Sequence, residues 1–224
     1  MTELGYLIHV MILICVFVLV GSRGKLPKYL VAMLGVGSIA ISAFIVALLA
    51  FEYFSQINPE PYIVTIYTWM QVGSLKTDVG FYIDGLTLTM MFVITGVGLL
   101  IHIYSSLFMA EDEDYSRFFS YMNLFVSAML ILVLADNLLL LFVGWEGVGL
   151  CSYLLVGFWH KDEANGAAAR KAFIVTRIGD TAMALGMFLL FMHLGTLNMQ
   201  AMAQVASQHW SVGDITLTIA CLLL

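Results

Sequence analysis

A single carboxylate stands near the middle of an apolar stretch that is long enough to cross a lipid bilayer. The stretch is LLLLFVGWEGVGLCSYLLVGFW, residues 138–159, and the carboxylate is Glu146. An ionisable group at the centre of a spanning helix costs about 3 kcal/mol on insertion scales, so it usually has a partner or faces water, and it often has a function. Because burial disfavours a charged carboxylate and a nearby cation favours it, Glu146 is a candidate for taking up and releasing protons near neutral pH. The alternative is a neutral or hydrogen-bonded glutamate that only holds helices together.

Two further charges lie in the next apolar segment. Arg177 and Asp180 are three residues apart near the middle of AARKAFIVTRIGDTAMALGMFLLF, so they share one helical face and can pair with each other. They either tune the charge of Glu146 or form a static ion pair that fixes helix packing. Lys171 and His102 are secondary candidates for the same proton path. The alternatives are a lysine that extends toward the lipid headgroups and a hydrogen-bonded structural histidine.

Small residues recur beside Glu146 on the same segment. Gly144, Gly147 and Cys151 follow one another at helical spacing. Because small side chains let two backbones come together, this pattern predicts the close approach of another helix.

The elements that must position these charges are membrane helices. Of the 224 residues, 62% are hydrophobic and 11% are charged, and the mean hydropathy is +0.98. This is more apolar surface than a soluble core of this size can bury. A helix rises about 1.5 Å per residue, so about 20 apolar residues cross a hydrocarbon layer of about 30 Å. We therefore predict an all-α bundle of about six complete transmembrane helices, at residues 4–21, 30–54, 83–109, 117–135, 138–159 and 168–194, with the start of a seventh near Ile215.

The segments between these helices have their own patterns. Alternating β-branched and aromatic residues with a turn at Gly73 predict a short external β-hairpin at about residues 60–80. Asp84 is expected to begin the third helix. Residues 198–210 are typical of a short helix lying in the membrane interface, anchored by Trp210.

The positions of Lys and Arg predict an N-terminus outside the membrane. With that orientation, the outer side holds only Lys76, and Arg177 lies within the membrane. The remaining basic residues fall on the inner side, namely Arg23, Lys25, Lys28, Arg117, Lys161, Arg170 and Lys171.

Several function classes are disfavoured by composition and motifs. The net charge of -6 argues against nucleic acid as a partner. The three cysteines lie in apolar runs without metal-ligand spacing, and no phosphate loop, dinucleotide fingerprint or haem attachment motif is present. No cofactor or metal is therefore expected in this chain, which has the pattern of a conduit.

The string GWEGVGLCSYLLVGFW, residues 144–159, closely resembles the hallmark segment of the L-subunit family of bacterial respiratory complex I, the counterpart of mitochondrial NADH dehydrogenase subunit 5. The strings FYIDGLTLTMMFVITGVGLLIHIYSS, YSRFFSYMNLF, LVLADNLLL and NGAAARKAFIVTRIGD extend the resemblance over nearly the whole chain, most weakly in the first two helices. The resemblance implies an antiporter-like subunit that translocates protons. By resemblance, Glu146 matches the glutamate of the proton path, and Arg177 and Asp180 match the family's charged pair.

The same resemblance implies an organisation and a setting. Residues 1–110 match an N-terminal region of three helices, and residues 111–224 match the start of the proton-translocating antiporter-like domain. The lysine with which the family's glutamate works does not occur before Leu224, and the final DITLTIACLLL is about half a span, so we expect a piece of a longer protein. The implied partners are the other membrane and peripheral subunits in a bacterial inner membrane, with NADH, FMN, iron–sulfur clusters and quinone bound in those subunits. The alternatives are a cation/proton antiporter subunit and a truncated structural fragment that does not conduct.

Overall fold

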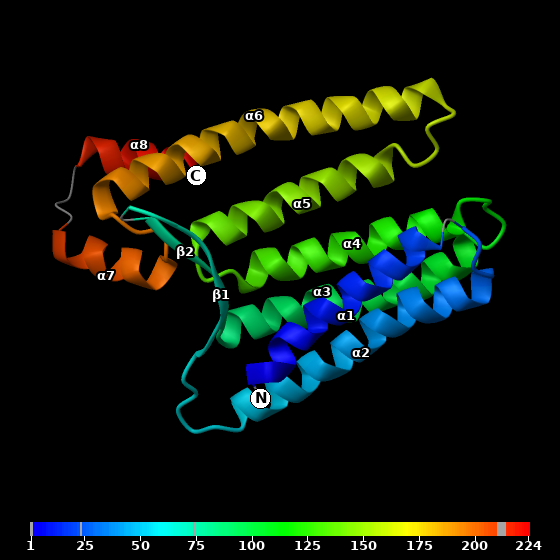
Figure 1. The fold of residues 1–224 in the computed structure, drawn as a ribbon, viewed down its shortest axis with the longest axis horizontal. Helices are drawn as coiled ribbons and strands as arrows, with labels where there is room; N and C mark the ends of the chain where they lie inside the picture. The colour runs from blue at the N-terminus through cyan, green and yellow to red at the C-terminus, as the bar shows by residue number, and fades with distance from the viewer. Residues whose placement is uncertain (1, 23, 74, 210–213) are drawn as a thin grey trace.

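The chain folds into long helices that lie side by side (Figure 1). This computed structural model describes residues 2–22, 24–73, 75–209 and 214–224, and 73% of the chain is helical. The long helices are α1 (Thr2–Gly21), α2 (Lys28–Phe54), α3 (Gly85–Phe108), α4 (Tyr115–Leu134), α5 (Leu138–Val156) and α6 (Glu163–Leu194). The shorter elements are the strands β1 (Tyr62–Val72) and β2 (Leu75–Ile83) and the helices α7 (Met199–His209) and α8 (Ile215–Leu223). The predicted class, a helical bundle with a two-stranded hairpin, is confirmed at this level.

Five helices in the described part of the chain, α2 to α6, are long and apolar enough to cross a membrane. Helix α1 is 20 residues long, and Met11–Gly21 forms its apolar part among the residues whose side chains are described. The helix at the chain's end begins at Ile215, as the sequence indicates. The count of six complete spans stays a prediction.

Two helix starts show how local chemistry sets the boundaries. Asp84 begins α3 as predicted: its carboxylate accepts a hydrogen bond from the Thr87 backbone N–H at 2.8 Å, and Ile83 belongs to β2 rather than to the helix. Helix α6 begins at Glu163, earlier than the apolar pattern indicates, because Asp162 caps it by accepting from the Ala164 backbone N–H. The first turn of α6 is therefore helical although its residues are mostly polar or small.

The predicted hairpin is present and is tied to the helices at one end of the bundle. Its strands pair antiparallel, and Gly73 beside the turn has a φ of +59°, which favours glycine. The backbone N–H of Asp136, between α4 and α5, donates to the Gly80 carbonyl of β2, and Met199 at the start of α7 donates to the Asp136 carbonyl. We call this meeting of hairpin, α4–α5 turn and α6–α7 turn the hairpin junction. Trp210, the expected anchor after α7, lies outside the described residues.

Helix α4 lies at the centre of the packing. It contacts α1, α2, α3 and α5, and 44% of its most apolar window is buried, against 17% for α5 and 22% for α6. A buried hydrogen bond from Ser38 of α2 to Asn123 of α4 joins two of these helices at 2.9 Å. Helices α5 and α6 form a thinner layer on the side of α4.

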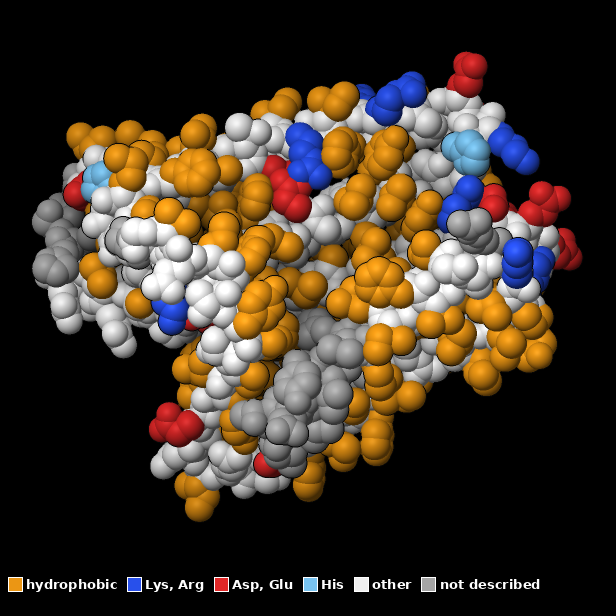
Figure 2. All heavy atoms as spheres, viewed as in Figure 1, with side chains coloured by type: hydrophobic (Ala, Val, Ile, Leu, Met, Phe, Trp, Pro, Cys, Tyr) orange, Lys and Arg blue, Asp and Glu red, His pale blue; other side chains and the backbone are white. Residues whose placement is uncertain are grey.

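Charge is distributed unevenly along the helices. Lys and Arg side chains gather at the end that carries the α1–α2, α3–α4 and α5–α6 loops, and few are seen elsewhere on this face (Figure 2). The hairpin and the start of α7 lie at the opposite end. Of the basic residues assigned to the inner loops, Arg23 lies outside the described part of the chain.

Candidate functional site

Three of the predicted charges meet between α5 and α6. The Glu146 carboxylate of α5 forms an ion pair with the Arg177 guanidinium of α6, and the same guanidinium nitrogen lies 3.8 Å from a carboxylate oxygen of Asp180. The pairing of Arg177 with Asp180 was expected, whereas the closer pairing with Glu146 comes from the packing of two helices. We call Glu146, Arg177 and Asp180 the charged triad. Two carboxylates and one guanidinium carry a net charge of -1 when all are ionised, so one added proton makes the triad neutral.

The side chains of the charged triad are buried to different degrees. The side chain of Asp180 is 8% exposed, whereas those of Glu146 and Arg177 are 24% and 35% exposed. In a low-dielectric setting, opposite charges at contact distance stabilise one another, and an uncompensated charge is costly.

Aromatic side chains complete the site. The indole Nε1–H of Trp145 donates to a carboxylate oxygen of Asp180 at 2.8 Å. The Arg177 guanidinium lies 4.4 Å from the centroid of the Phe173 ring, and Tyr153 packs against that ring at 5.3 Å. Together these contacts hold Arg177 between its two carboxylates.

Sequence reasoning did not identify Trp145 or Phe173. A signal for each was present, since an indole N–H inside an apolar segment needs an acceptor and Phe173 precedes Arg177 by one helical turn. Which acceptor Trp145 reaches depends on the neighbouring helix, and Asp180 lies 35 residues away in the chain.

The small residues of α5 set the direction in which Glu146 points. A Cβ on Gly144 would lie 2.6 Å from the backbone nitrogen of Leu132 in α4, and one on Gly147 would lie 3.0 Å from the Cβ of Ala128. Cys151 is fully buried. The predicted close approach of another helix is therefore confirmed, and that helix is α4. Because one side of α5 is pressed against α4, the side with Glu146 turns to α6.

The secondary candidates lie apart from the triad. His102 is fully buried in α3, its Nδ1 is 2.7 Å from the Gly98 carbonyl, and its ring packs against Phe119 of α4. Lys171 is exposed in the first half of α6. Among the described residues, no hydrogen bond or ion pair joins either side chain to the triad. These surroundings favour the structural histidine and the headgroup-facing lysine that the sequence left as alternatives.

Other groups that could bind a ligand are few in the described part of the chain. Within the described ranges, no group of three or more His, Cys, Asp or Glu side chains is arranged to hold a metal ion. Cys15 and Cys151 are buried free thiols, and Cys221 is an exposed one. The charged triad is the site with the clearest chemistry.

Known families match most of the chain. Residues 69–119 match the family described as NADH-ubiquinone oxidoreductase (complex I), chain 5 N-terminus, and residues 135–224 match the one described as NADH:quinone oxidoreductase/Mrp antiporter, TM. The chain is 48% identical over 203 residues to NADH-quinone oxidoreductase subunit L of Escherichia coli (strain K12) and 50% identical over 205 residues to the protein of that name from Pseudomonas aeruginosa. Each alignment covers 91% of this chain and 33% of the relative, so the chain spans about a third of their length.

Solved structures share the fold. A chain of the Mrp complex from Dietzia sp. DQ12-45-1b matches 96% of this chain at a TM-score of 0.77 and 21% identity, and 22% of that chain is covered. A chain of the archaeal membrane-bound sulfane sulfur reductase matches 98% at a TM-score of 0.77 and 18% identity, with 42% of that chain covered. At these identities the likeness concerns the fold alone. Apolar helices and membrane-complex relatives together identify an integral membrane protein.

Proposed function

The chain belongs to the subunit L family of NADH-quinone oxidoreductases, and we propose that it forms part of a membrane subunit that translocates protons. The energy comes from NADH oxidation and quinone reduction in partner subunits, which hold the FMN, the iron–sulfur clusters and the quinone. The chain itself contributes charged groups inside the membrane. The observation that carries this proposal is the charged triad shared by α5 and α6.

The geometry of the triad suggests how a proton is held and passed on. When Glu146 is ionised, Arg177 neutralises it across the helix interface. When Glu146 takes up a proton, its attraction for the guanidinium falls, and Asp180 on the same helix offers Arg177 a second carboxylate at 3.8 Å. Trp145 keeps Asp180 in place for this exchange through its indole hydrogen bond. Movement of Arg177 between two carboxylates thus couples the charge of Glu146 to the position of a cation.

The test is Glu146→Gln in the complete subunit, assembled with its partners in its native membrane. The amide keeps the size of the side chain but carries no ionisable oxygen, so we expect NADH-driven proton translocation to fall at least about tenfold. Assembly is followed by the amount of complex on native gels. The matched control is Glu163→Gln, which removes the same charge from the exposed start of α6 and should leave translocation unchanged. Full translocation by an assembled Glu146→Gln complex would overturn the proposal.

The setting of the chain is part of the proposal. We place it in the inner membrane of a bacterium with the N-terminus outside, since the basic side chains gather at the opposite end from the hairpin. Its partners are the other membrane and peripheral subunits of the complex. The division at residues 110 and 111, between an N-terminal region and the antiporter-like domain, is kept as a prediction.

A second candidate is a cation/proton antiporter subunit, because the family matched by residues 135–224 covers Mrp antiporters as well. In that case the charged triad would exchange a proton against a cation gradient rather than respond to redox chemistry. Sodium-dependent proton movement in vesicles without NADH would favour the antiporter. A third reading, a structural piece that does not conduct, predicts that Glu146 variants alter assembly and never proton flux.

A further inference from the structure

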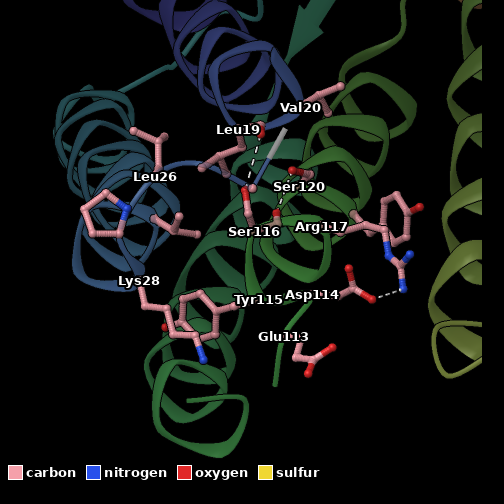
Figure 3. A pocket seen from close by; sticks show the side chains of 14 residues that line it. Leu19, Val20, Leu26, Lys28, Glu113, Asp114, Tyr115, Ser116, Arg117 and Ser120 are labelled. Carbon is pink, nitrogen blue, oxygen red and sulfur yellow. Dashed lines mark hydrogen bonds and ion pairs between the residues drawn. The ribbon is translucent and has the colours of Figure 1, made fainter. Parts of the chain in front are cut away.

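A cavity opens where α1 ends and α2 and α4 begin (Figure 3). Its volume is about 510 Å³, which is within the range of about 300–1,000 Å³ typical of ligand pockets. Leu19, Val20 and Leu26 form an apolar side, whereas Ser116 and Ser120 of α4 line it with hydroxyl groups. The cavity therefore combines apolar and polar walls at the level where membrane helices end.

Among the described residues, the charged side chains that line this cavity are balanced. Lys28 and Arg117 contribute two cations, and Glu113 and Asp114 contribute two carboxylates. The Lys28 ammonium donates one hydrogen bond to the Ala110 carbonyl at 2.8 Å, so two of its three N–H groups remain for a ligand. A ligand that matches this lining carries one charge of each sign.

Arg117 forms an ion pair with one of the two carboxylates that line the cavity. Its guanidinium pairs with Asp114 at 2.8 Å and lies 4.9 Å from the centroid of the Phe158 ring. In Figure 3 the Asp114 and Glu113 side chains lie near each other, and Lys28 extends beside Tyr115. The Arg117–Asp114 pair is therefore satisfied within the protein, and the groups left for a ligand are the Lys28 ammonium and the Glu113 carboxylate.

The backbone adds to the anion side. The first turns of α2 and α4 line the cavity, and neither N-cap, Pro27 or Asp114, makes a side-chain capping bond. Elsewhere in the described chain, α3, α5, α6 and α8 each have an Asp or Asn side chain that caps the first turn. Free backbone N–H groups at a helix start favour phosphate oxygens and reinforce the lysine.

We propose that this cavity binds the headgroup of an ethanolamine phospholipid from the surrounding leaflet. The phosphate lies at Lys28 and the first turns of α2 and α4, and the primary ammonium donates a hydrogen bond to Glu113. The acyl chains follow the outward face of α1, where Phe17 is 73% exposed and Val20, which also lines the cavity, is 59% exposed.

The lining also disfavours two other phospholipid headgroups, glycerol and choline. A glycerol headgroup offers Glu113 only neutral hydroxyl donors, which bind a carboxylate more weakly than an ammonium does and leave its charge uncompensated. A choline headgroup has the positive charge but no N–H donor, so it cannot replace the hydrogen bonds of a primary ammonium. The proposed selectivity is therefore for ethanolamine over both choline and glycerol headgroups.

The test uses native mass spectrometry of the intact protein, purified in mild detergent and stripped of lipid. Phosphatidylethanolamine, phosphatidylcholine and phosphatidylglycerol with the same acyl chains are titrated separately. We expect phosphatidylethanolamine to bind about tenfold more tightly than the others, since each competitor loses charge-assisted hydrogen bonds. Equal binding of all three lipids would overturn the proposal.

Variants locate the binding on the protein. Lys28→Gln and Glu113→Gln should each weaken phosphatidylethanolamine binding by about tenfold, whereas the neighbouring Lys25→Gln and Glu111→Gln, which do not line the cavity, should not. The charge-keeping variants Lys28→Arg and Glu113→Asp should retain most of the binding, which separates loss of contact from loss of folding. Equal loss in the control pair would contradict the site. Displacement of the lipid by millimolar inorganic phosphate or phosphoethanolamine alone would show a free-anion site instead and would also overturn the lipid assignment.

Discussion

The bundle of α1 to α4 and the layer of α5 and α6 accommodate polar side chains between apolar helices in different ways. In the bundle, several buried hydroxyl groups bond within their own helix: Ser42 donates to the Ser38 carbonyl and Thr95 to the Met91 carbonyl, each one turn back. In the layer, the polar groups are charged, and Glu146 finds its partner on the neighbouring helix. Neutral groups that bond within their own helix cost little in a membrane, whereas charges must be paired across helices.

This difference separates groups that serve packing from the groups that carry the proposed function. A hydroxyl group bonded to its own helix cannot change its charge, so it contributes to packing alone. Two carboxylates that share one guanidinium can change charge by one proton and redistribute the cation.

The largest effect is expected for Arg177→Gln in the assembled complex. Without the guanidinium, Glu146 and Asp180 lose their shared cation, and nothing then offsets the cost of a charged carboxylate between apolar helices. Proton translocation should fall at least about tenfold. Arg170→Gln, an exposed arginine on the same helix, serves as the control and should pump normally. If both variants pump alike, the distinction between layer and bundle loses its functional basis.

A smaller effect is expected for Trp145→Phe, which keeps the ring but removes the donor to Asp180. Loss of one hydrogen bond to a charged acceptor corresponds to about 1.5–3 kcal/mol. Because Asp180 still has Arg177, we expect an effect below that range, about 0.7–1.4 kcal/mol, which is a reduction of translocation by about threefold to tenfold. Trp159→Phe, whose indole donates to Asp112 in the α3–α4 loop, should leave the rate unchanged. A normal rate for Trp145→Phe would show that Asp180 needs no indole donor.

In the bundle, Ser38→Ala should affect stability and not transport. The variant removes the donor to the Asn123 side-chain carbonyl and should lower the free energy of unfolding by about 1 kcal/mol. Thermal unfolding in detergent measures this loss, and the exposed Ser207→Ala on α7 provides the reference. A selective loss of proton translocation by a fully folded Ser38→Ala protein would break the comparison, because the bundle would then take part in conduction.

The smallest effect concerns the hairpin junction outside the helices. Burial, and then the nearby Asp78 charge, raise the pKa of Asp136 above its ordinary value of 3.8. The folded state then binds a proton more tightly than the unfolded state, so this stabilisation is full below pH 3.8 and is lost as the pH rises through the raised pKa. Asp136→Asn should therefore be more stable than the parent at pH 7, and the gain should vanish at low pH.

Asp112 provides a control of opposite sign for that measurement. The Trp159 indole that bonds to Asp112, followed by weaker attractions to nearby groups, lowers the pKa of that carboxyl. Its contribution is present above the ordinary pKa and is lost as the pH falls, so Asp112→Asn should destabilise the protein at pH 7. Thermal unfolding of both variants between pH 3 and pH 7 gives the two slopes. Parallel slopes would contradict the assignment for Asp136.

The sequence was most informative where a pattern is local. Apolar runs predicted the helices from α2 to α6 within a few residues, because helix length follows from the thickness of the bilayer. The hairpin turn at Gly73 and the capping role of Asp84 followed from residue types alone. Insertion cost singled out Glu146, Arg177 and Asp180, and helical spacing indicated the small-residue surface of α5.

The tertiary structure decided which groups meet. Spacing pairs Arg177 with Asp180, because both lie on one helix, but the stronger pairing with Glu146 depends on the rotation of α5. That rotation is set by contacts of Gly144 and Gly147 with α4; the spacing of the small residues indicates this face of α5 but not which helix packs against it. For the same reason the acceptor of Trp145 and the cavity between the starts of α2 and α4 follow only from how separate helices pack, since hydrophobic periodicity gives the buried face of a helix and not the neighbour against it.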